Sequence, residues 1–241
     1  MNELEFIENL NKINIEISKE KLDKLNKYYE YLVYYNSKIN ITSITKKEDV
    51  YLKHFYDSLT LTKAVDLNNN LTICDIGTGA GFPGIVLKIV FPNIKLTLVE
   101  SIKKKTIFLR EVVNLLNLKD VEIINDRVEN FAKFNKNKFD LVTCRAVSSL
   151  NIISELCIPI TKIDGYFIPM KGEKIEDTTF LTKLNAKIEK ICEFILPIEN
   201  SKRTLIKIKK VGNTNNIYPR TFKLIKEKPL KWKVIVFFLF F

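Results

Sequence analysis

The sequence lacks several groups on which common enzyme chemistries depend. It holds one histidine, no Gly-x-Ser-x-Gly nucleophile elbow and no arrangement of paired catalytic acids. Its cysteines are scattered without a Cys-x-x-Cys spacing, and three of the four lie inside apolar runs. We therefore predict no metal site and no disulfides, but buried free thiols in a reducing cytosol. The four cysteines are Cys74, Cys144, Cys157 and Cys192.

Targeting and membrane-spanning segments are also missing from the sequence. The first ten residues, MNELEFIENL, have no basic region leading into an apolar block, which a secretory signal would need. The one strongly apolar stretch, residues 234–241, is far shorter than the roughly 20 residues that span a bilayer. We expect a soluble cytoplasmic protein.

Acidic residues are scarce in one region only. The chain carries a net charge of +11, and residues 201–241 hold eleven Lys or Arg against a single acid, Glu227. Ten of the eleven net positive charges therefore fall in this segment. We expect a polyanion to meet the fold mainly there, unless the segment is only a solvated basic tail. Neutralising Lys207, Lys209 and Arg220 is then expected to weaken RNA binding and to flatten its salt dependence.

The pattern of apolar residues changes near residue 70. Residues 18–36 show helical spacing after a capping Ser18, and a second helix is predicted from the Thr45 cap to about Val65. Strand-like and helix-like runs then alternate, which predicts a parallel, doubly wound α/β sheet. The predicted strands are Leu71–Asp75, Leu96–Glu100, Val121–Asn125, Phe139–Cys144 and Tyr166–Pro169. The predicted helices between them are Gly84–Val90, Lys104–Leu116, Val128–Phe134 and Leu150–Ile160.

The end of the alternating region distinguishes between two fold families. We predict a helix over Lys174–Ile191, followed by two strands, Phe194–Pro197 and Thr204–Lys209, which so short a turn must pair antiparallel. This layout is typical of class I methyltransferases, whereas a dinucleotide-binding domain adds a sixth parallel strand and a separate substrate domain. We expect a helical cap (1–67), a Rossmann-like methyltransferase domain (68–211) and a basic C-terminal tail (212–241).

Glycine is rare except at one place. Four of the seven glycines lie between residues 77 and 84, directly after a predicted strand and before a predicted helix. Glycines there permit positive φ angles and let the backbone approach a nucleoside closely. The run contains both G-x-G-x-x-G, the dinucleotide fingerprint, and acid-x-G-x-G-x-G, the start of an S-adenosylmethionine site.

The acidic residue before the loop favours the second interpretation. Asp75 would repel a pyrophosphate at the helix N-terminus but suits the ammonium group of a methionine moiety. Glu100, at the end of the next strand, is placed for a ribose diol in either case and does not discriminate. The sequence therefore favours S-adenosylmethionine over a nicotinamide dinucleotide.

Several segments together resemble one family, the bacterial small-subunit ribosomal RNA guanine-N7 methyltransferases, also called glucose-inhibited division protein B. The resemblance runs from about residue 20 to 220. It rests on NITSITKKEDVYLKHFYDSL (40–59), DIGTGAGFPGIVL (75–87), ES with following lysines (100–105), RVENF (127–131), RAVSSL (145–150), GYFIPMKG (165–172) and YPR (218–220). The segment YPRTFKLIKEKPL lacks the Gly and Pro that family members carry there, and KWKVIVFFLFF has no recognised counterpart.

The resemblance implies methyl transfer from S-adenosylmethionine to N7 of a guanine in 16S ribosomal RNA, by a protein that we expect to be a monomer. Gly77 and Phe82 would hold the cofactor, residues 100–102 would lie along its ribose, and Val128 and Glu129 would flank its adenine. With the loop residues, the expected cofactor set is Asp75, Gly77, Gly79, Gly81, Phe82, Glu100, Ser101, Ile102, Val128, Glu129 and Arg145.

Four residues are candidates to position the acceptor guanine or RNA. Arg145, at the end of the fourth strand, would grip the methionine carboxylate or an RNA phosphate, or form a salt bridge there. His54 and Asp57, three positions apart on a helix, would form a structural hydrogen bond or contact the guanine. Lys171 is either an RNA contact or a solvated lysine.

The scarcity of acid–base groups agrees with this chemistry. Guanine N7 has an in-plane lone pair and no proton, so its methylation needs positioning but no general base. Two other functions remain open at this point. One is an oxidoreductase that binds a dinucleotide through Gly79, Gly81 and Gly84, and the other is a non-enzymatic ribosome assembly factor that uses only the basic C-terminal segment.

Overall fold

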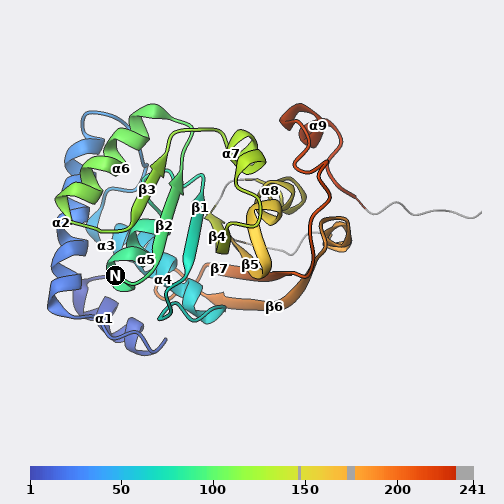
Figure 1. Ribbon diagram of the computed structural model, residues 1–241. Helices are drawn as coiled ribbons and strands as arrows, with labels where there is room; N and C mark the ends of the chain where they lie inside the picture. The colour runs from blue at the N-terminus through green and yellow to red at the C-terminus, as the bar shows by residue number, and fades with distance from the viewer. Residues whose placement is uncertain (146–147, 173–176, 232–241) are drawn as a thin grey trace, which may run out of the picture.

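The fold is known from a computed structural model, which describes residues 1–145, 148–172 and 177–231 (Figure 1). Its centre is a seven-stranded sheet in the order β3-β2-β1-β4-β5-β7-β6. The strands are β1 (Thr72–Ile76), β2 (Lys95–Val99), β3 (Val121–Ile124), β4 (Phe139–Arg145), β5 (Thr161–Lys171), β6 (Ala186–Ile195) and β7 (Lys202–Lys210). This is the class I methyltransferase arrangement that the sequence predicts.

The first five strands are parallel to one another, and only β7 runs in the opposite direction. β1 pairs with both β2 and β4, so the strand order reverses direction beside β1. β7 inserts antiparallel between β5 and β6. In sheets of this kind a ligand binds beyond the carboxyl ends of the strands at the reversal point. The predicted antiparallel ending is confirmed.

Helices cover both faces of the sheet. Alternate residues of β1 point to opposite sides, so each face presents apolar side chains that a helix layer buries. Ile73 belongs to a core shared with the N-terminal helices, whereas Cys74 and Ile76 belong to a second core. The helices of the first face include α5 (Gly84–Val90) and α6 (Lys103–Leu115), and those of the second include α7 (Val128–Phe134) and α8 (Leu150–Cys157). A one-turn 3-10 helix (Ile158–Ile160) extends α8. These four helices agree with the predicted ranges to within a few residues.

A helical cap precedes the sheet. It contains α1 (Glu3–Asn11), α2 (Lys19–Asn36), α3 (Lys47–Val50), a π-helical turn η1 (Tyr51–Tyr56), α4 (Asp57–Leu59) and a 3-10 turn η2 (Thr60–Lys63). Ser18 caps α2 as predicted, by accepting a hydrogen bond from the Lys21 N–H. The second cap is wrong, because α3 begins after Lys46 without a side-chain bond.

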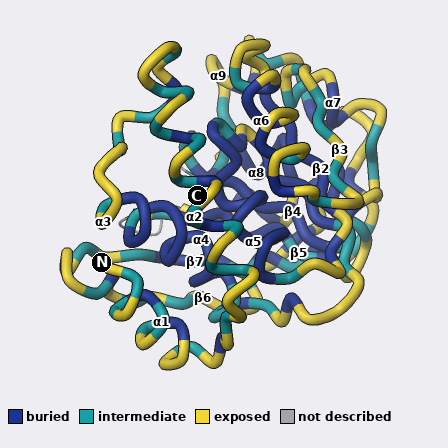
Figure 2. Tube along the Cα trace, turned by 90° about the vertical axis from the view of Figure 1, so that its left-hand side faces the viewer, coloured by how far each residue is buried: buried dark blue, intermediate teal, exposed yellow. Residues whose placement is uncertain are grey.

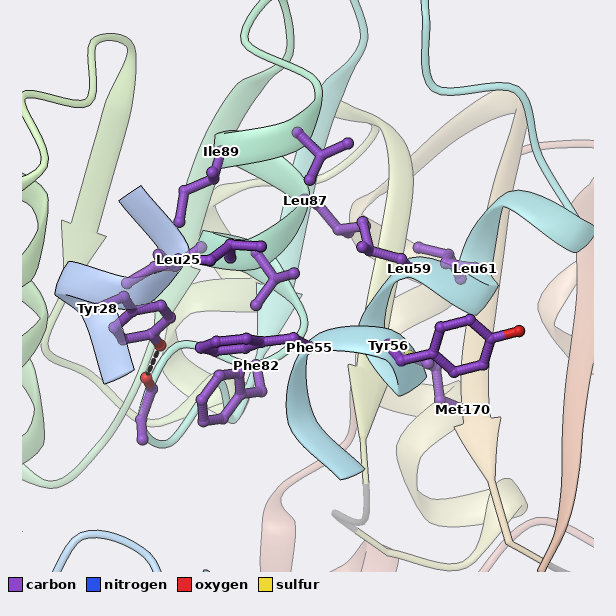
Figure 3. Close-up of a cluster of buried hydrophobic side chains, with 14 of the residues drawn as sticks. Leu25, Tyr28, Phe55, Tyr56, Leu59, Leu61, Phe82, Leu87, Ile89 and Met170 are labelled. Atoms are coloured by element: carbon purple, nitrogen blue, oxygen red, sulfur yellow. Dashed lines mark hydrogen bonds between the residues drawn. The ribbon is translucent and has the colours of Figure 1, made fainter. Parts of the chain in front are cut away.

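The cap shares its core with the sheet. Side chains of α2 and η1, such as Leu25 and Phe55, are buried in the same cluster as Leu87 of α5 (Figure 3). The burial pattern shows this continuous interior as dark blue tube in the middle of the molecule (Figure 2). The glycine loop after β1 thus has the cap on one side.

One predicted helix is wrong. Within the expected range of 174–191, the described residues form a short 3-10 helix, η4 (Thr179–Leu184), and the first half of β6. Asn185 adopts a left-handed conformation, with φ of 53°, which ends η4 and starts the strand. Phe180 and Leu184 are buried at spacing that also fits a helix, so sequence alone could not find this end.

The segment after β7 returns across the second face of the sheet. It contains α9 (Phe222–Glu227), and Ile225 and Leu230 pack in the second core. The apolar end that the sequence singles out, residues 232–241, lies outside the described residues. In the described part of the chain, no helix is long and apolar enough to cross a membrane.

Candidate functional site

The glycine loop follows β1 at the reversal point of the sheet. Gly77, Gly79 and Gly81 have φ of 66°, 59° and 97°, which L side chains rarely adopt. Gly77 N–H donates to the carbonyl of Val99 at the end of β2, over 2.9 Å. Three positive φ angles within five residues explain why glycine is concentrated here in a chain that otherwise uses little of it.

Asp75, at the end of β1, binds both ends of the glycine loop through one carboxylate. Its Oδ2 accepts hydrogen bonds from Thr78 Oγ1 (2.6 Å) and from the Gly84 N–H (2.9 Å). Burial raises the pKa of Asp75 to about 6, although these hydrogen bonds act to lower it. Its Oδ1 is buried without a hydrogen-bond partner in the described residues. Asp75 is therefore a brace of the loop, and contact with an ammonium group remains a prediction.

Glu100 is fixed at the end of β2. Its Oε2 accepts from the Gly79 N–H (3.0 Å) and its Oε1 from the Ile102 N–H (2.8 Å). Asn125, beyond β3, donates to the carbonyl of Glu100 (2.9 Å) and keeps the turn in place. A carboxylate oriented by two backbone donors still has free lone pairs to accept from two vicinal hydroxyl groups.

The two sides of the loop differ in how much room they leave. A Cβ at Gly79 would meet nothing within 4 Å, whereas a Cβ at Gly81 would lie 2.6 Å from Ile85 Cδ1 and 2.6 Å from Tyr28 Oη. The loop is thus open beside Glu100 and closed against the cap. An open, glycine-lined edge next to a fixed carboxylate fits a nucleoside.

The other predicted cofactor residues lie along the same edge. Ser101 and Ile102 are exposed between β2 and α6, and Val128 and Glu129 begin α7 after β3. We call the glycine loop, Glu100 and these neighbours the loop half of the site. Its members follow the carboxyl ends of three adjacent strands, β1, β2 and β3. The glycine motif predicts the loop, whereas residues 101–102 and 128–129 are expected from the family resemblance.

Arg145, at the end of β4, belongs to a different arrangement. Its Nη1 donates to Asp57 Oδ2 (3.2 Å) and to the Lys53 carbonyl (2.7 Å). Asp57, which is buried, also accepts from Arg203 Nε through Oδ1 (3.0 Å). One carboxylate from the cap therefore holds two guanidinium groups from β4 and β7. The salt bridge weighed for Arg145 exists, and its contact with a ligand remains a prediction.

His54 completes this arrangement. Arg145 Nη2 lies 3.0 Å from His54 Nδ1, and because arginine can only donate, this nitrogen is the acceptor. The ring proton then sits on Nε2, which faces Thr42 Oγ1 at 3.2 Å. Burial and the neighbouring Arg145 charge lower the pKa of His54 to about 3. His54 is a neutral, hydrogen-bonded ring.

Phe82 joins the two parts of the site. The His54 ring stacks on it with centroids 4.2 Å apart, and the Arg145 guanidinium lies 5.3 Å from its centroid. The Phe82–Pro83 peptide bond is cis. The Phe-Pro continuation of the glycine loop thus places an aromatic ring between the loop half and the charged residues.

A cavity of about 390 Å³ opens beside these charged residues. Cations, two acids and a histidine line it together with apolar atoms of β4 and β5. We call it the charged half of the site; its polar lining includes Lys53, His54, Asp57, Arg145, Ser148, Lys171, Glu199 and Arg203. Lys171 donates to the Ser148 carbonyl (2.8 Å), so it is held at the cavity wall.

Sequence reasoning missed Arg203, Glu199 and Lys53 in this cavity. Lys53 forms ion pairs with Asp49 and with Glu199, each over 3.3 Å. The basic segment was read as one patch, so Arg203 was not separated from its neighbours. Its partner Asp57 lies 146 positions away, and no short motif signals such a pair.

Several basic residues of the segment expected to meet a polyanion are paired within the protein. Lys207 pairs with Glu189 (2.8 Å), Lys209 with Asp164 (3.0 Å), and Arg220 with the buried Glu155 (2.6 Å). Lys210 is buried, and burial lowers its pKa to about 8. The excess of positive charge in residues 201–231 is therefore no measure of free positive surface.

A larger cavity, of about 640 Å³, lies near the amino ends of β1 and β4. Several of its charged residues are already paired, for example Lys162 with Asp140 at 2.7 Å. It lies at the opposite edge of the sheet from the glycine loop. Because parallel sheets bind ligands at the carboxyl ends of their strands, the smaller cavity is the better candidate.

Comparison with known sequences gives a consistent result. The family described as GidB, rRNA small subunit methyltransferase G, matches residues 21–217. The chain is 42% identical over 234 residues to the ribosomal RNA small subunit methyltransferase G of Oceanobacillus iheyensis, covering 94% of this chain and 98% of that protein. It is 42% identical over 227 residues to the protein of the same name from Bacillus subtilis, covering 91% and 95%.

Solved structures share the fold at low sequence identity. A SAM dependent methyltransferase from Aquifex aeolicus superposes with a TM-score of 0.50 at 19% identity, over 73% of this chain and 97% of that chain. TrmN from Thermus thermophilus superposes with a TM-score of 0.51 at 10% identity, over 64% and 48%. At such identities the likeness concerns the fold alone.

Proposed function

The chain belongs to the rRNA small subunit methyltransferase G family, and we propose on that premise that it methylates N7 of a guanine in 16S ribosomal RNA. Family membership makes it an S-adenosylmethionine-dependent rRNA methyltransferase. The choice of N7 goes further. It rests on the charged half of the site, where the described residues offer no free general base.

Among the described residues that line this cavity, the histidine and both carboxylates are already engaged. His54 uses Nδ1 to accept from Arg145 and has a pKa of about 3, so it does not take up a proton near neutral pH. Asp57 binds two guanidinium groups, and Glu199 is paired with Lys53. An acceptor nitrogen or oxygen that must lose a proton would need such a group. Guanine N7 has a lone pair and no proton, so it needs none.

The loop half fits S-adenosylmethionine. Glu100 would accept hydrogen bonds from the ribose hydroxyls, while the open edge at Gly79 leaves room for the nucleoside. Residues 101–102 and 128–129 would line the ribose and adenine. When bound, S-adenosylmethionine supplies a methyl group on a positively charged sulfur, which is transferred without acid or base catalysis.

The chain's own contribution is then to position and to shield. Holding two reactants in line lowers a reaction barrier by about 7 to 11 kcal/mol. Phe82, fixed between the loop and the His54 ring, sets the distance between the two halves. The cations of the charged half suit RNA phosphates.

We also keep the division into cap (1–67), methyltransferase domain (68–211) and C-terminal tail (212–241) as a proposal. The core shared by the cap and the sheet supports a cap that packs on the catalytic domain. We propose that the protein acts as a monomer in the cytoplasm, on 16S ribosomal RNA or on a small-subunit particle.

The test is a comparison of 16S ribosomal RNA from cells with and without the gene, mapped by mass spectrometry. We expect one guanine to lose one methyl group in the deletion strain and to regain it when the gene is restored. A variant with Gly81→Ala should not restore it. An unchanged modification map in the deletion strain would overturn the proposal.

A further inference from the structure

Tyr28 of α2 lies under the glycine loop. Its side chain is fully buried, and its ring packs between elements that are distant in sequence. The ring stacks on Phe55 of η1 with centroids 5.7 Å apart and lies 5.4 Å from the Phe82 ring. The Phe108 ring of α6 is a third neighbour, with centroids 6.5 Å apart and ring planes 29° apart. Three rings from three elements therefore fix where the Tyr28 hydroxyl points.

That hydroxyl donates to the carbonyl of Ala80, in the middle of the loop (dashed in Figure 3). Burial raises the pKa of the Tyr28 phenol well above its usual range, so the proton needed for this bond is present. The Tyr28 hydroxyl also leaves no room for a side chain at the next residue, because a Cβ on Gly81 would lie 2.6 Å from Tyr28 Oη. The loop backbone thus rests directly on the hydroxyl.

The other braces of the loop come from the sheet. Asp75 holds Thr78 and Gly84, while the Val99 carbonyl and the Glu100 carboxylate hold the N–H groups of Gly77 and Gly79. Ala80 lies between these anchors. Without Tyr28, a buried carbonyl would lose its partner at the point where the loop turns back toward α5.

We propose that Tyr28 is a positioning residue for the cofactor, through which the helical cap sets the conformation of the glycine loop. The proposal rests on the proposed function, because it assumes that the loop binds S-adenosylmethionine. Tyr28 acts through Ala80 and Gly81 and does not itself touch a reacting atom. It gives the cap a role in cofactor affinity, and no sequence motif marks that role.

Tyr28→Phe tests the proposal, because it keeps the ring and removes only the hydroxyl. We expect the affinity for S-adenosylhomocysteine, measured by calorimetry, to fall on the order of tenfold, since a buried carbonyl is left unsatisfied. The KM for S-adenosylmethionine should rise by a similar factor, with kcat at saturating cofactor changed less than twofold.

Tyr51→Phe is the matched control. Tyr51 is also fully buried in the same core, but its hydroxyl binds Asn26 Oδ1 (2.8 Å), away from the loop. Both variants should lose similar thermal stability, whereas only Tyr28→Phe should weaken cofactor binding. Hydrogen exchange should likewise become faster at residues 77–82 in Tyr28→Phe alone.

Three outcomes are distinguishable. Weaker binding and faster loop exchange in Tyr28→Phe alone would support the positioning role. Wild-type binding by Tyr28→Phe, or an equal loss in Tyr51→Phe, would overturn it and leave the proposed function intact. No binding of S-adenosylhomocysteine by the unmutated chain would overturn the proposed function, and the positioning role with it.

Discussion

The loop half of the site is held mainly by backbone groups, whereas the charged half is held by side chains. In the loop half, three glycines adopt positive φ and two carboxylates accept backbone N–H groups. In the charged half, Asp57 joins Arg145 and Arg203, and His54 is bonded to Arg145. A backbone cradle tolerates few substitutions at its glycines, while a charge network fails when one member loses its charge.

The largest effect on cofactor binding is expected from Gly81→Ala. Alanine is strained at a φ of 97°, and its Cβ would lie 2.6 Å from Ile85 and from Tyr28. We expect the affinity for S-adenosylhomocysteine to fall on the order of a hundredfold, which is about 2.7 kcal/mol. Gly212→Ala is the control, because its Cβ would have only an ordinary contact at 3.6 Å. Equal binding by the two variants would show that the loop geometry does not determine affinity.

Asp57→Asn should separate the two halves. The amide keeps the shape but leaves two guanidinium groups without their shared anion, which should lower the free energy of unfolding by about 3 kcal/mol. We expect kcat for RNA methylation to fall at least tenfold and cofactor affinity to stay within twofold of wild type.

Asp140→Asn serves as the control for Asp57→Asn. It removes another paired acid, bonded to Lys162 at 2.7 Å, at the opposite edge of the sheet. This variant should lose stability but keep kcat. A large loss of cofactor affinity in Asp57→Asn would contradict the separation of the two halves.

The charged half should also govern part of the pH dependence of stability. The pKa of His54 is lowered to about 3 in the fold, so between pH 6.5 and 3 the unfolded chain binds a proton there that the folded chain does not. Stability from this group is complete above pH 6.5 and is lost as the pH falls. Between pH 6 and 4.5 the loss is about 2 kcal/mol.

Denaturant unfolding of wild type and His54→Asn across that pH range measures this term. The raised pKa of Asp75 makes the fold more stable as the pH falls, which opposes the effect of His54. Both proteins contain Asp75, so its contribution cancels in the difference between their free energies of unfolding. The stability difference should shrink steadily as the pH falls. A constant difference would show that His54 is protonated normally in the fold.

The smallest effect is expected where the sequence alone pointed to RNA binding. Lys207 and Lys209 are ion-paired near the edge of the sheet opposite the glycine loop, so replacing both with Gln should change RNA affinity less than threefold. Lys103 and Lys104 are exposed at the start of α6, beside the loop half. Replacing these two with Gln should reduce the slope of log affinity against log salt by about 1 to 2. The reverse ranking would restore the C-terminal segment as the main RNA contact.

How well the site could be predicted also differs between the halves. The glycine loop is contiguous in sequence. Its glycines, Asp75 before it and Glu100 at the end of the next strand are predicted because a strand, a turn and a helix leave local patterns. His54 and Asp57 are predicted as a pair and Arg145 as a separate candidate, but the sequence does not predict that Arg145 bonds to both. Asp57 and Arg203 are 146 positions apart, and only the folded chain brings them together.

The fold shows the same limit. The parallel strands and their helices follow from the alternation of apolar runs, whereas the start of β6 was hidden by helix-like spacing around η4. The left-handed conformation of Asn185 ends η4 at that boundary, and the presence of an asparagine does not by itself predict this conformation. The ion pairs of Lys207, Lys209 and Arg220 could not be predicted either, because a count of charges does not show which acid each cation meets in the fold.

The most direct test is methylation in vitro. Purified protein is incubated with small ribosomal subunits from the deletion strain and with S-adenosylmethionine labelled in its methyl group, and the RNA is then reduced and cleaved at N7-methylguanosine. We predict that label enters 16S ribosomal RNA and that cleavage occurs at a single guanine. Label on an exocyclic amine or a ribose hydroxyl, where a proton must be removed, would contradict the account, which depends on finding no free general base among the described residues of the cavity.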